Sequence, residues 1–92
     1  MWLFLNDSFL SIVQKPGDGD LLTVRARIQG DIEKVFPEAK VVEGKGTDYR
    51  YRARIPRARI AEALVELVNG LSYDNFKSSV SDRQRHDAYM DV

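Results

Sequence analysis

Cysteine is absent from the 92-residue sequence, and histidine occurs only once. Without cysteine the chain forms no disulfide scaffold, iron–sulfur cluster or thiolate zinc site, and it has no cysteine nucleophile. An excess of charge of one sign is also lacking, because 14 Lys and Arg balance 14 Asp and Glu. No net field of the whole molecule therefore attracts it to DNA or to an anionic membrane.

Long hydrophobic runs are missing as well. Asn6 and Asp7 interrupt the apolar N-terminal segment 2–5. The hydrophobic region of a secretory signal needs roughly 7–15 residues, and a membrane helix needs about 18. We therefore expect a cytoplasmic protein without a membrane partner. The composition, 43% hydrophobic and 30% charged, is typical of a globular chain, and the length predicts a single domain over residues 1–92.

The spacing of apolar residues predicts the secondary structure. Apolar and polar residues alternate from Leu22 to Ile28, which is typical of a strand with one buried face. Further along, apolar residues recur at helical spacing, and Asp31 is positioned to cap a short helix. The expected strands are 2–5, 9–13, 22–28, 40–43 and 48–55, and the expected helices are 32–36, 57–69 and a C-terminal helix over 81–90.

This element order, β(β)βαββα followed by a C-terminal helix, predicts an α+β fold. Alternating strands combined with amphipathic helices favour a mostly antiparallel sheet with the helices packed on one face. The central βαββα stretch is similar to part of a ferredoxin-like split sheet.

Basic residues are concentrated in the middle of the neutral chain. Residues 21–59 contain ten Lys and Arg but only five Asp and Glu. Strand alternation places five arginines opposite the apolar side chains of two strands, so they share one face if both strands lie in one sheet. These arginines are Arg25, Arg27, Arg50, Arg52 and Arg54. Neighbouring like charges repel, and a guanidinium group fits phosphate or carboxylate.

Two interpretations of this arginine face remain open. In the first, the five arginines bind an anionic protein surface or a nucleic acid. In the second, the face is solvated, its arginines pair with internal carboxylates, and their stems cover apolar sheet surface. The candidate carboxylates are Asp18, Asp20, Glu43, Asp87 and Asp91.

The aromatic residues do not favour nucleic acid at this stage. Single-strand binders built on a split sheet stack bases on aromatic side chains of the open face. The alternation predicts that Tyr49 and Tyr51 share the apolar face with Ile55. Stacking platforms are therefore not expected beside the arginines.

The two N-terminal strands are apolar on both faces, and strands of this kind are usually covered by other parts of a protein on both faces. Helix 57–69 supplies cover for one side. The C-terminal helix or a second subunit supplies it for the other, so a homodimer is an open alternative.

Residues with catalytic or metal-binding chemistry are scarce. His86 has a single carboxylate at helical spacing, Asp82, and Met90 is a poor ligand, so no metal site is expected. The serines at 78, 79 and 81 lack the G-x-S-x-G context of a nucleophile elbow. We expect no enzymatic activity and no cofactor.

Several segments are distinctive: 2–13 (WLFLNDSFLSIV), 30–37 (GDIEKVFP), 48–52 (DYRYR) and 85–89 (RHDAY). With them the chain resembles a group of short proteobacterial proteins that form a domain of unknown function. The resemblance spans nearly the whole chain and implies a stand-alone bacterial domain, but it carries no activity or site residues over to this sequence.

The sequence thus predicts a non-enzymatic interaction or regulatory module that presents an arginine-rich sheet face to an anionic partner, alone or as a homodimer. A nucleic-acid-binding protein is the first alternative. A mobile-element inhibitor, similar to an anti-CRISPR protein, is the second, because such proteins are also small stand-alone domains.

Overall fold

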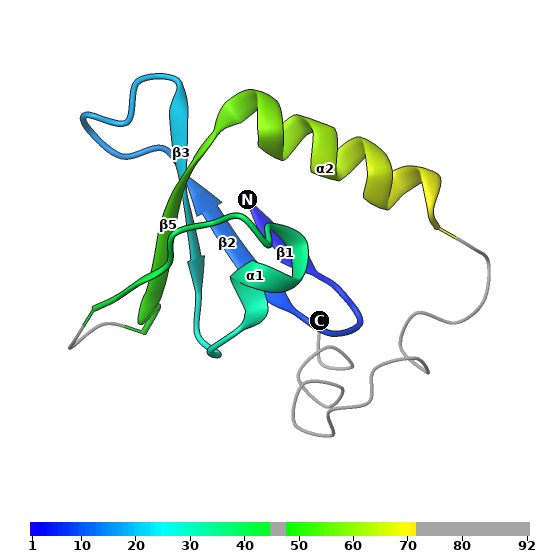
Figure 1. The fold of residues 1–92 in the computed structure, drawn as a ribbon, viewed down its shortest axis with the longest axis horizontal. Coiled ribbons are helices and arrows are strands. Elements are labelled where there is room, and N and C mark those ends of the chain that lie inside the picture. Colours follow the sequence, from blue (N-terminus) through cyan, green and yellow to red (C-terminus); the bar gives the residue numbers. More distant parts are fainter. Residues whose placement is uncertain (45–47, 72–92) are drawn as a thin grey trace.

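A computed structural model describes residues 1–44 and 48–71 of the chain (Figure 1). Within these residues a five-stranded sheet is combined with two helices. The elements are β1 (Trp2–Phe4), β2 (Phe9–Val13), β3 (Leu21–Ala26), α1 (Asp31–Val35), β4 (Val42–Glu43), β5 (Tyr51–Pro56) and α2 (Arg57–Asn69). The predicted C-terminal helix over 81–90, His86 and the serines at 78, 79 and 81 lie outside the described residues.

The strands are ordered β1-β2-β3-β5-β4, and every neighbouring pair in this sheet is antiparallel. The predicted α+β class with a mostly antiparallel sheet is therefore confirmed. The ferredoxin-like part of the prediction is not confirmed. A split βαβ unit places parallel strands in one sheet, whereas β3 here pairs directly with β5 in antiparallel register over six residues.

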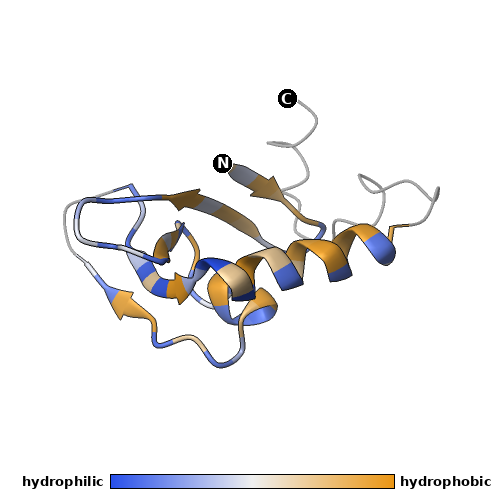
Figure 2. Ribbon diagram, turned by 90° about the horizontal axis from the view of Figure 1, so that it is seen from above, coloured by the Kyte–Doolittle hydropathy of each residue, from blue (hydrophilic) through white to orange (hydrophobic). Residues whose placement is uncertain are grey.

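Both helices pack against the same face of the sheet (Figures 1 and 2). Alternate residues of β2, β3 and β5 point to this face and form a core with apolar side chains from the two helical segments. The core residues are Leu10, Ile12, Val24, Ala26, Ile32, Phe36, Ala53, Ile55, Ile60 and Ala63. Because side chains alternate along a strand, the residues between them point to the opposite face, which we call the open face. No described helix covers it.

Four strands, β1, β3, β4 and β5, are shorter than predicted, and the differences in β3 and β5 change where several side chains lie. β3 ends at Ala26, so Ile28 does not continue the buried row and is 47% exposed. β5 begins at Tyr51, three residues later than expected. Residues 48–50 therefore lie outside the regular alternation of the strand.

Asp31 does not cap a helix as predicted. The residue before α1 is Gly30, whose φ of 93° lies in the left-handed region that favours glycine, and no side chain caps the helix. Asp31 is the first residue of α1 and is fully buried. Its Oδ2 accepts a hydrogen bond from the backbone N–H of Phe9 at 2.9 Å. The carboxylate thus joins α1 to the start of β2.

Among the residues that the structure describes, no helix has the length and apolar character required to cross a lipid bilayer.

Candidate functional site

The strand register gathers aromatic and basic side chains on the open face. Trp2 lies opposite Ser11, and Phe4 lies opposite Phe9. Ser11 lies opposite Arg25, and Arg25 lies opposite Arg52. Directly opposed residues of neighbouring strands point to the same side of a sheet. These side chains therefore form a row across β1, β2, β3 and β5.

Aromatic rings occupy the β1–β2 end of this row. The rings of Phe4 and Phe9 are stacked, with centroids 4.7 Å apart. Trp2 meets both of them edge-on, at 6.1 Å from Phe4 and 6.3 Å from Phe9. Trp2 is nevertheless 63% exposed. A large aromatic side chain thus stands at the edge of the sheet with most of its surface accessible to a partner.

Tyr49 corrects the prediction that this residue lies on the apolar face. Its ring centroid is 6.4 Å from that of Phe9. The guanidinium carbons of Arg25 and Arg27 lie 4.3 and 5.0 Å from the same ring. The carbonyl oxygen of Tyr49 also accepts a hydrogen bond from Nε of Arg52 at 3.2 Å. The prediction assumed that the alternation of the strand includes Tyr49. Because β5 begins only at Tyr51, the alternation does not determine the side on which the Tyr49 ring lies.

Two of the five predicted arginines pair with internal carboxylates, as the second interpretation expected. Nε of Arg54 lies 3.1 Å from Asp18 Oδ1. Nη2 of Arg50 lies 3.4 Å from Glu43 Oε1. Glu43 is opposite Tyr51 in the sheet, and the Tyr51 side chain packs against the core. Because Arg50 pairs with Glu43, its guanidinium group is directed away from the open face. Arg50 is therefore not part of the site.

The other three arginines form no ion pair with any described residue. Arg25 donates from Nη2 to Ser11 Oγ at 2.7 Å. Arg27 is exposed, and its guanidinium carbon lies 5.7 Å from the ring centroid of Phe9. Aromatic rings partly offset the repulsion between such cations, since each cation–π contact contributes about 0.5–2 kcal/mol. Within the described residues, the positive charge of these arginines therefore has no carboxylate partner.

We call this set the aromatic–arginine surface. It consists of Trp2, Phe4, Phe9, Arg25, Arg27, Tyr49 and Arg52. Sequence reasoning identified its arginines but missed its aromatic side chains. A usable signal was present, because the alternation of 2–5 and 9–13 already separates Trp2, Phe4 and Phe9 from Leu3 and Leu10. Which of the two sets faces the helices depends on the pairing with β3, and that pairing is not local.

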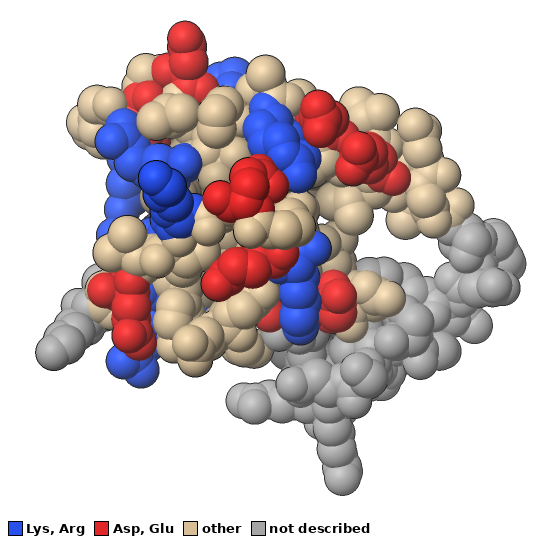
Figure 3. All heavy atoms as spheres, viewed as in Figure 1, with Lys and Arg blue, Asp and Glu red and all other residues tan. Residues whose placement is uncertain are grey.

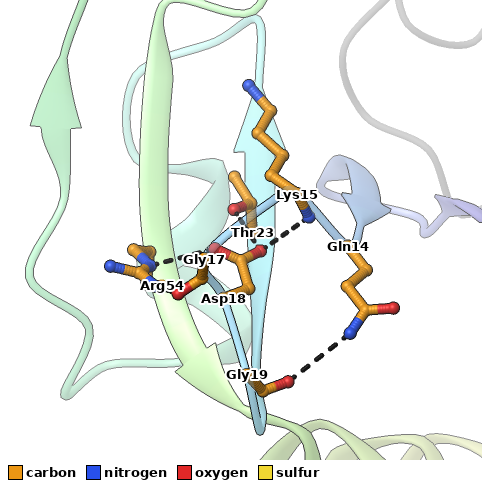
Figure 4. Close-up of polar contacts among 7 residues, drawn as sticks. All are labelled: Gln14, Lys15, Gly17, Asp18, Gly19, Thr23 and Arg54. Atoms are coloured by element: carbon orange, nitrogen blue, oxygen red, sulfur yellow. Dashed lines mark hydrogen bonds and ion pairs between the residues drawn. The ribbon is translucent and has the colours of Figure 1, made fainter.

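A loop over residues 14–20 closes the other end of the open face (Figure 4). Asp18 lies at its centre, with only 6% of its surface exposed. Its Oδ2 accepts hydrogen bonds from the backbone N–H of Lys15 and from Thr23 Oγ1, both at 2.9 Å. Its Oδ1 faces Arg54. Gly17 takes a φ of 87° in this loop, a conformation that suits glycine.

Basic side chains in the space-filling view gather over the side of the molecule that carries β4 and β5 (Figure 3). Acidic side chains are conspicuous along α2 in the same view. Acidic and basic side chains also lie side by side elsewhere on this face, so it is mixed in sign.

The hydrogen bonds of Asp18 make a prediction about acid stability. The backbone N–H of Lys15, the hydroxyl of Thr23 and the charge of Arg54 together lower the pKa of Asp18 from the ordinary aspartate value of about 3.9. Because the folded-state pKa lies below the unfolded-state pKa, this carboxylate stabilises the fold at neutral pH. The contribution is lost as the pH falls below about 4 and through the folded-state pKa.

We expect the melting temperature of the Asp18→Asn variant to be below that of the wild type at pH 7, and the gap to shrink markedly by pH 3. Thermal unfolding at both pH values, followed by circular dichroism, measures the two gaps. An equal gap at pH 7 and pH 3 would show that the ionised carboxylate of Asp18 does not stabilise the loop.

Within residues 1–44 and 48–71, no three His, Cys, Asp or Glu side chains are grouped so that they could hold a metal ion. Comparison with known proteins gives no further guide. No protein-family model matches the chain, and no curated protein and no solved structure shows significant similarity to it. The resemblance to the proteobacterial group stays a prediction, and function is argued from the geometry of the open face.

Proposed function

We propose that the protein is a binding module that holds an unpaired nucleic-acid strand on the aromatic–arginine surface. The observation that carries the proposal is the interleaving of cations and rings on one open sheet face. The guanidinium carbons of Arg25 and Arg27 both lie within about 5 Å of the Tyr49 ring centroid. The Tyr49 ring in turn lies next to Phe9, which contacts Trp2. Unpaired strands are bound in this way, by aromatic side chains that stack bases and basic side chains that contact phosphates.

The dimensions of the surface support this partner class. Neighbouring strands lie about 4.8 Å apart, so five strands span about 19 Å from β1 to β4. The exposed Trp2 lies at one end of this span and Arg52 lies toward the other. A duplex hides its base faces within the stack, whereas an unpaired strand presents them to aromatic rings. The proposed ligand is therefore single-stranded.

The first test is direct binding of a fluorescent 12-nucleotide oligonucleotide, a length within the roughly 4–16 nucleotides that a single-strand-binding OB fold covers. Three phosphate contacts, one for each arginine without an ion pair, predict a slope of log affinity against log salt of about −2. Fluorescence anisotropy at several salt concentrations measures the slope. Equal affinity for single strand and duplex, or no binding at low salt, would remove the proposal.

Trp2 tests the stacking half of the proposal. Base–aromatic stacking contributes about 1–3 kcal/mol per base, so Trp2→Ala is expected to weaken oligonucleotide binding by about tenfold. Val68→Ala is the matched control. Val68 is an apolar residue of α2 with the same exposed fraction, 63%, on the helix side of the sheet. If both variants bind as the wild type does, Trp2 does not stack on a base.

The two other partner predictions use the same face and are outcomes of this test. An acidic protein surface needs the arginines but not exposed aromatic rings, so it would leave binding sensitive to charge reversal and insensitive to Trp2→Ala. A homodimer formed through the apolar side chains of β1 and β2 would bury Trp2. Analytical ultracentrifugation of wild type and Trp2→Ala distinguishes the dimer, because only self-association would change with this substitution in the absence of oligonucleotide.

A further inference from the structure

A basic pocket lies on the open face beside the aromatic–arginine surface. Its volume is about 570 Å³, and the 14–20 loop forms one wall while β5 and the approach to β4 form the other. Four cationic residues among those that the structure describes line it, and they are Lys15, Lys40, Arg52 and Arg54. Asp18 is the only acid among the described lining residues, so these residues together carry a net charge of about +3 from four cations and one carboxylate.

The carboxylate of Asp18 does not neutralise this pocket. Both of its oxygens are engaged, Oδ2 by Lys15 N–H and Thr23 Oγ1, and Oδ1 by Arg54 Nε. Among the described residues, the side chains of Lys15, Lys40 and Arg52 form no ion pair. Three cations that pair with no acid in the described part of the chain thus lie around one cavity.

Asp18 also holds one donor of the pocket in place. Arg54 donates from Nε to Asp18 and from Nη2 to the carbonyl oxygen of Gly17 at 2.8 Å. These two contacts fix the plane of the guanidinium group, and its side chain is still 53% exposed. A donor that is already oriented loses little conformational entropy when it binds a ligand. The loop therefore prepares the pocket for an anion.

We infer that this basic pocket binds a phosphate monoester group. A monoester carries about −1.5 to −2 charges at neutral pH, which matches the excess of cations better than the single charge of a phosphodiester. Two sources supply the group: the terminal phosphate of a strand bound on the adjacent surface, or a free nucleoside monophosphate. The inference goes beyond the proposed function, because the pocket takes a phosphate whether or not a strand covers the aromatic rings.

The first arm of the test uses small probes without any oligonucleotide. Inorganic phosphate and adenosine 5′-monophosphate are titrated separately into ¹⁵N-labelled protein, and the backbone amide signals of residues 15, 17, 18, 23, 40, 52 and 54 are followed by NMR. We expect saturable shifts in the wild type and their loss in Lys15→Gln/Lys40→Gln. This variant keeps the loop intact, since Lys15 contacts Asp18 through its backbone.

The second arm compares two 12-nucleotide strands that differ only in a 5′-phosphate or a 5′-hydroxyl. We expect the wild type to bind the phosphorylated strand about tenfold more tightly, and Lys15→Gln/Lys40→Gln to bind both alike. The matched control is Lys34→Gln/Arg57→Gln, which removes the same charge from exposed positions on the two helices. The control should keep the tenfold preference.

The outcomes separate this inference from the proposed function. If phosphate shifts the wild-type signals but neither strand binds, the phosphate pocket is supported and the proposed single-strand binding is rejected. If both strands bind with equal affinity and free phosphate gives no response, the phosphate pocket is rejected and the proposed single-strand binding is kept. Shifts that persist in Lys15→Gln/Lys40→Gln would overturn the pocket as well, because its lysines would not be the ligands.

Discussion

Reversing the charges of Arg27 and Arg52 is expected to reduce oligonucleotide affinity by about 100-fold. A hydrogen bond to a charged group contributes about 1.5–3 kcal/mol, and two such contacts are removed together. Neither side chain forms an ion pair with a described residue, so the proposal assigns each of them a phosphate contact. The salt slope should fall from about −2 to about −0.7, because one of three phosphate contacts remains. Fluorescence anisotropy with the Arg27→Glu/Arg52→Glu variant measures both quantities.

A charge-matched control decides whether the effect is local. Arg50→Glu/Arg57→Glu changes the net charge equally, but Arg50 pairs with Glu43 away from the open face and Arg57 is the first residue of α2. Loss of an exposed ion pair such as Arg50–Glu43 costs at most about 1 kcal/mol of stability. If both double variants lose affinity to the same degree, bulk charge explains the binding and the aromatic–arginine surface does not.

Replacing Phe36 with alanine should have the largest effect on stability. Phe36 directly follows α1 and is 1% exposed in the core. The guanidinium carbon of Arg59 in α2 lies 5.2 Å from its ring centroid. Truncation of a buried phenylalanine costs about 3–5 kcal/mol, and a chain of this length has a total stability of roughly 5–14 kcal/mol. Urea unfolding of Phe36→Ala is expected to show this loss in the free energy of unfolding.

Val65→Ala is the control for this measurement, because Val65 is an apolar residue of α2 that is 59% exposed. Its stability should remain within about 0.5 kcal/mol of the wild type. A loss below about 1 kcal/mol for Phe36→Ala would contradict the packing described here, since even the smallest cavities left by such truncations cost more. At low temperature, where Phe36→Ala remains folded, oligonucleotide binding should be unchanged because Phe36 lies on the helix side of the sheet.

Local pattern was sufficient to locate most elements of this fold. The aromatic and β-branched residues of 9–13, the alternation within 22–28 and the helical spacing within 57–69 predicted β2, β3 and α2, with differences of at most two residues at their ends. The ends of the strands were predicted less accurately, because the alternating sequence pattern continues into segments that do not pair with another strand. Residues 48–50 continue the alternating sequence pattern but are not part of β5. For this reason the prediction did not place Tyr49 beside Arg25.

Candidate site residues were predicted less completely than the elements that carry them. The alternation of charged and apolar residues predicted the shared sheet face of Arg25, Arg52 and Arg54, which the strand register places there, while the role of these arginines in binding stays a prediction. For Arg50 the sequence left two interpretations open, and its ion pair with Glu43 agrees with the second, in which an internal carboxylate pairs with the arginine. The basic pocket was missed, because Lys15 and Lys40 are separated by 25 residues and meet only through the loop and the edge of the sheet.

The amino-acid sequence by itself determined the α+β class, the alternating faces of the strands and the absence of thiol chemistry, because each of these follows from residue type and short-range spacing. Tertiary structure decided which rings stand beside which arginines, which arginines are neutralised internally, and where the cations enclose a pocket. The physical reason is that strand register and loop closure bring together residues far apart in the chain, and a shift of one residue in register moves every side chain of a strand to the other face.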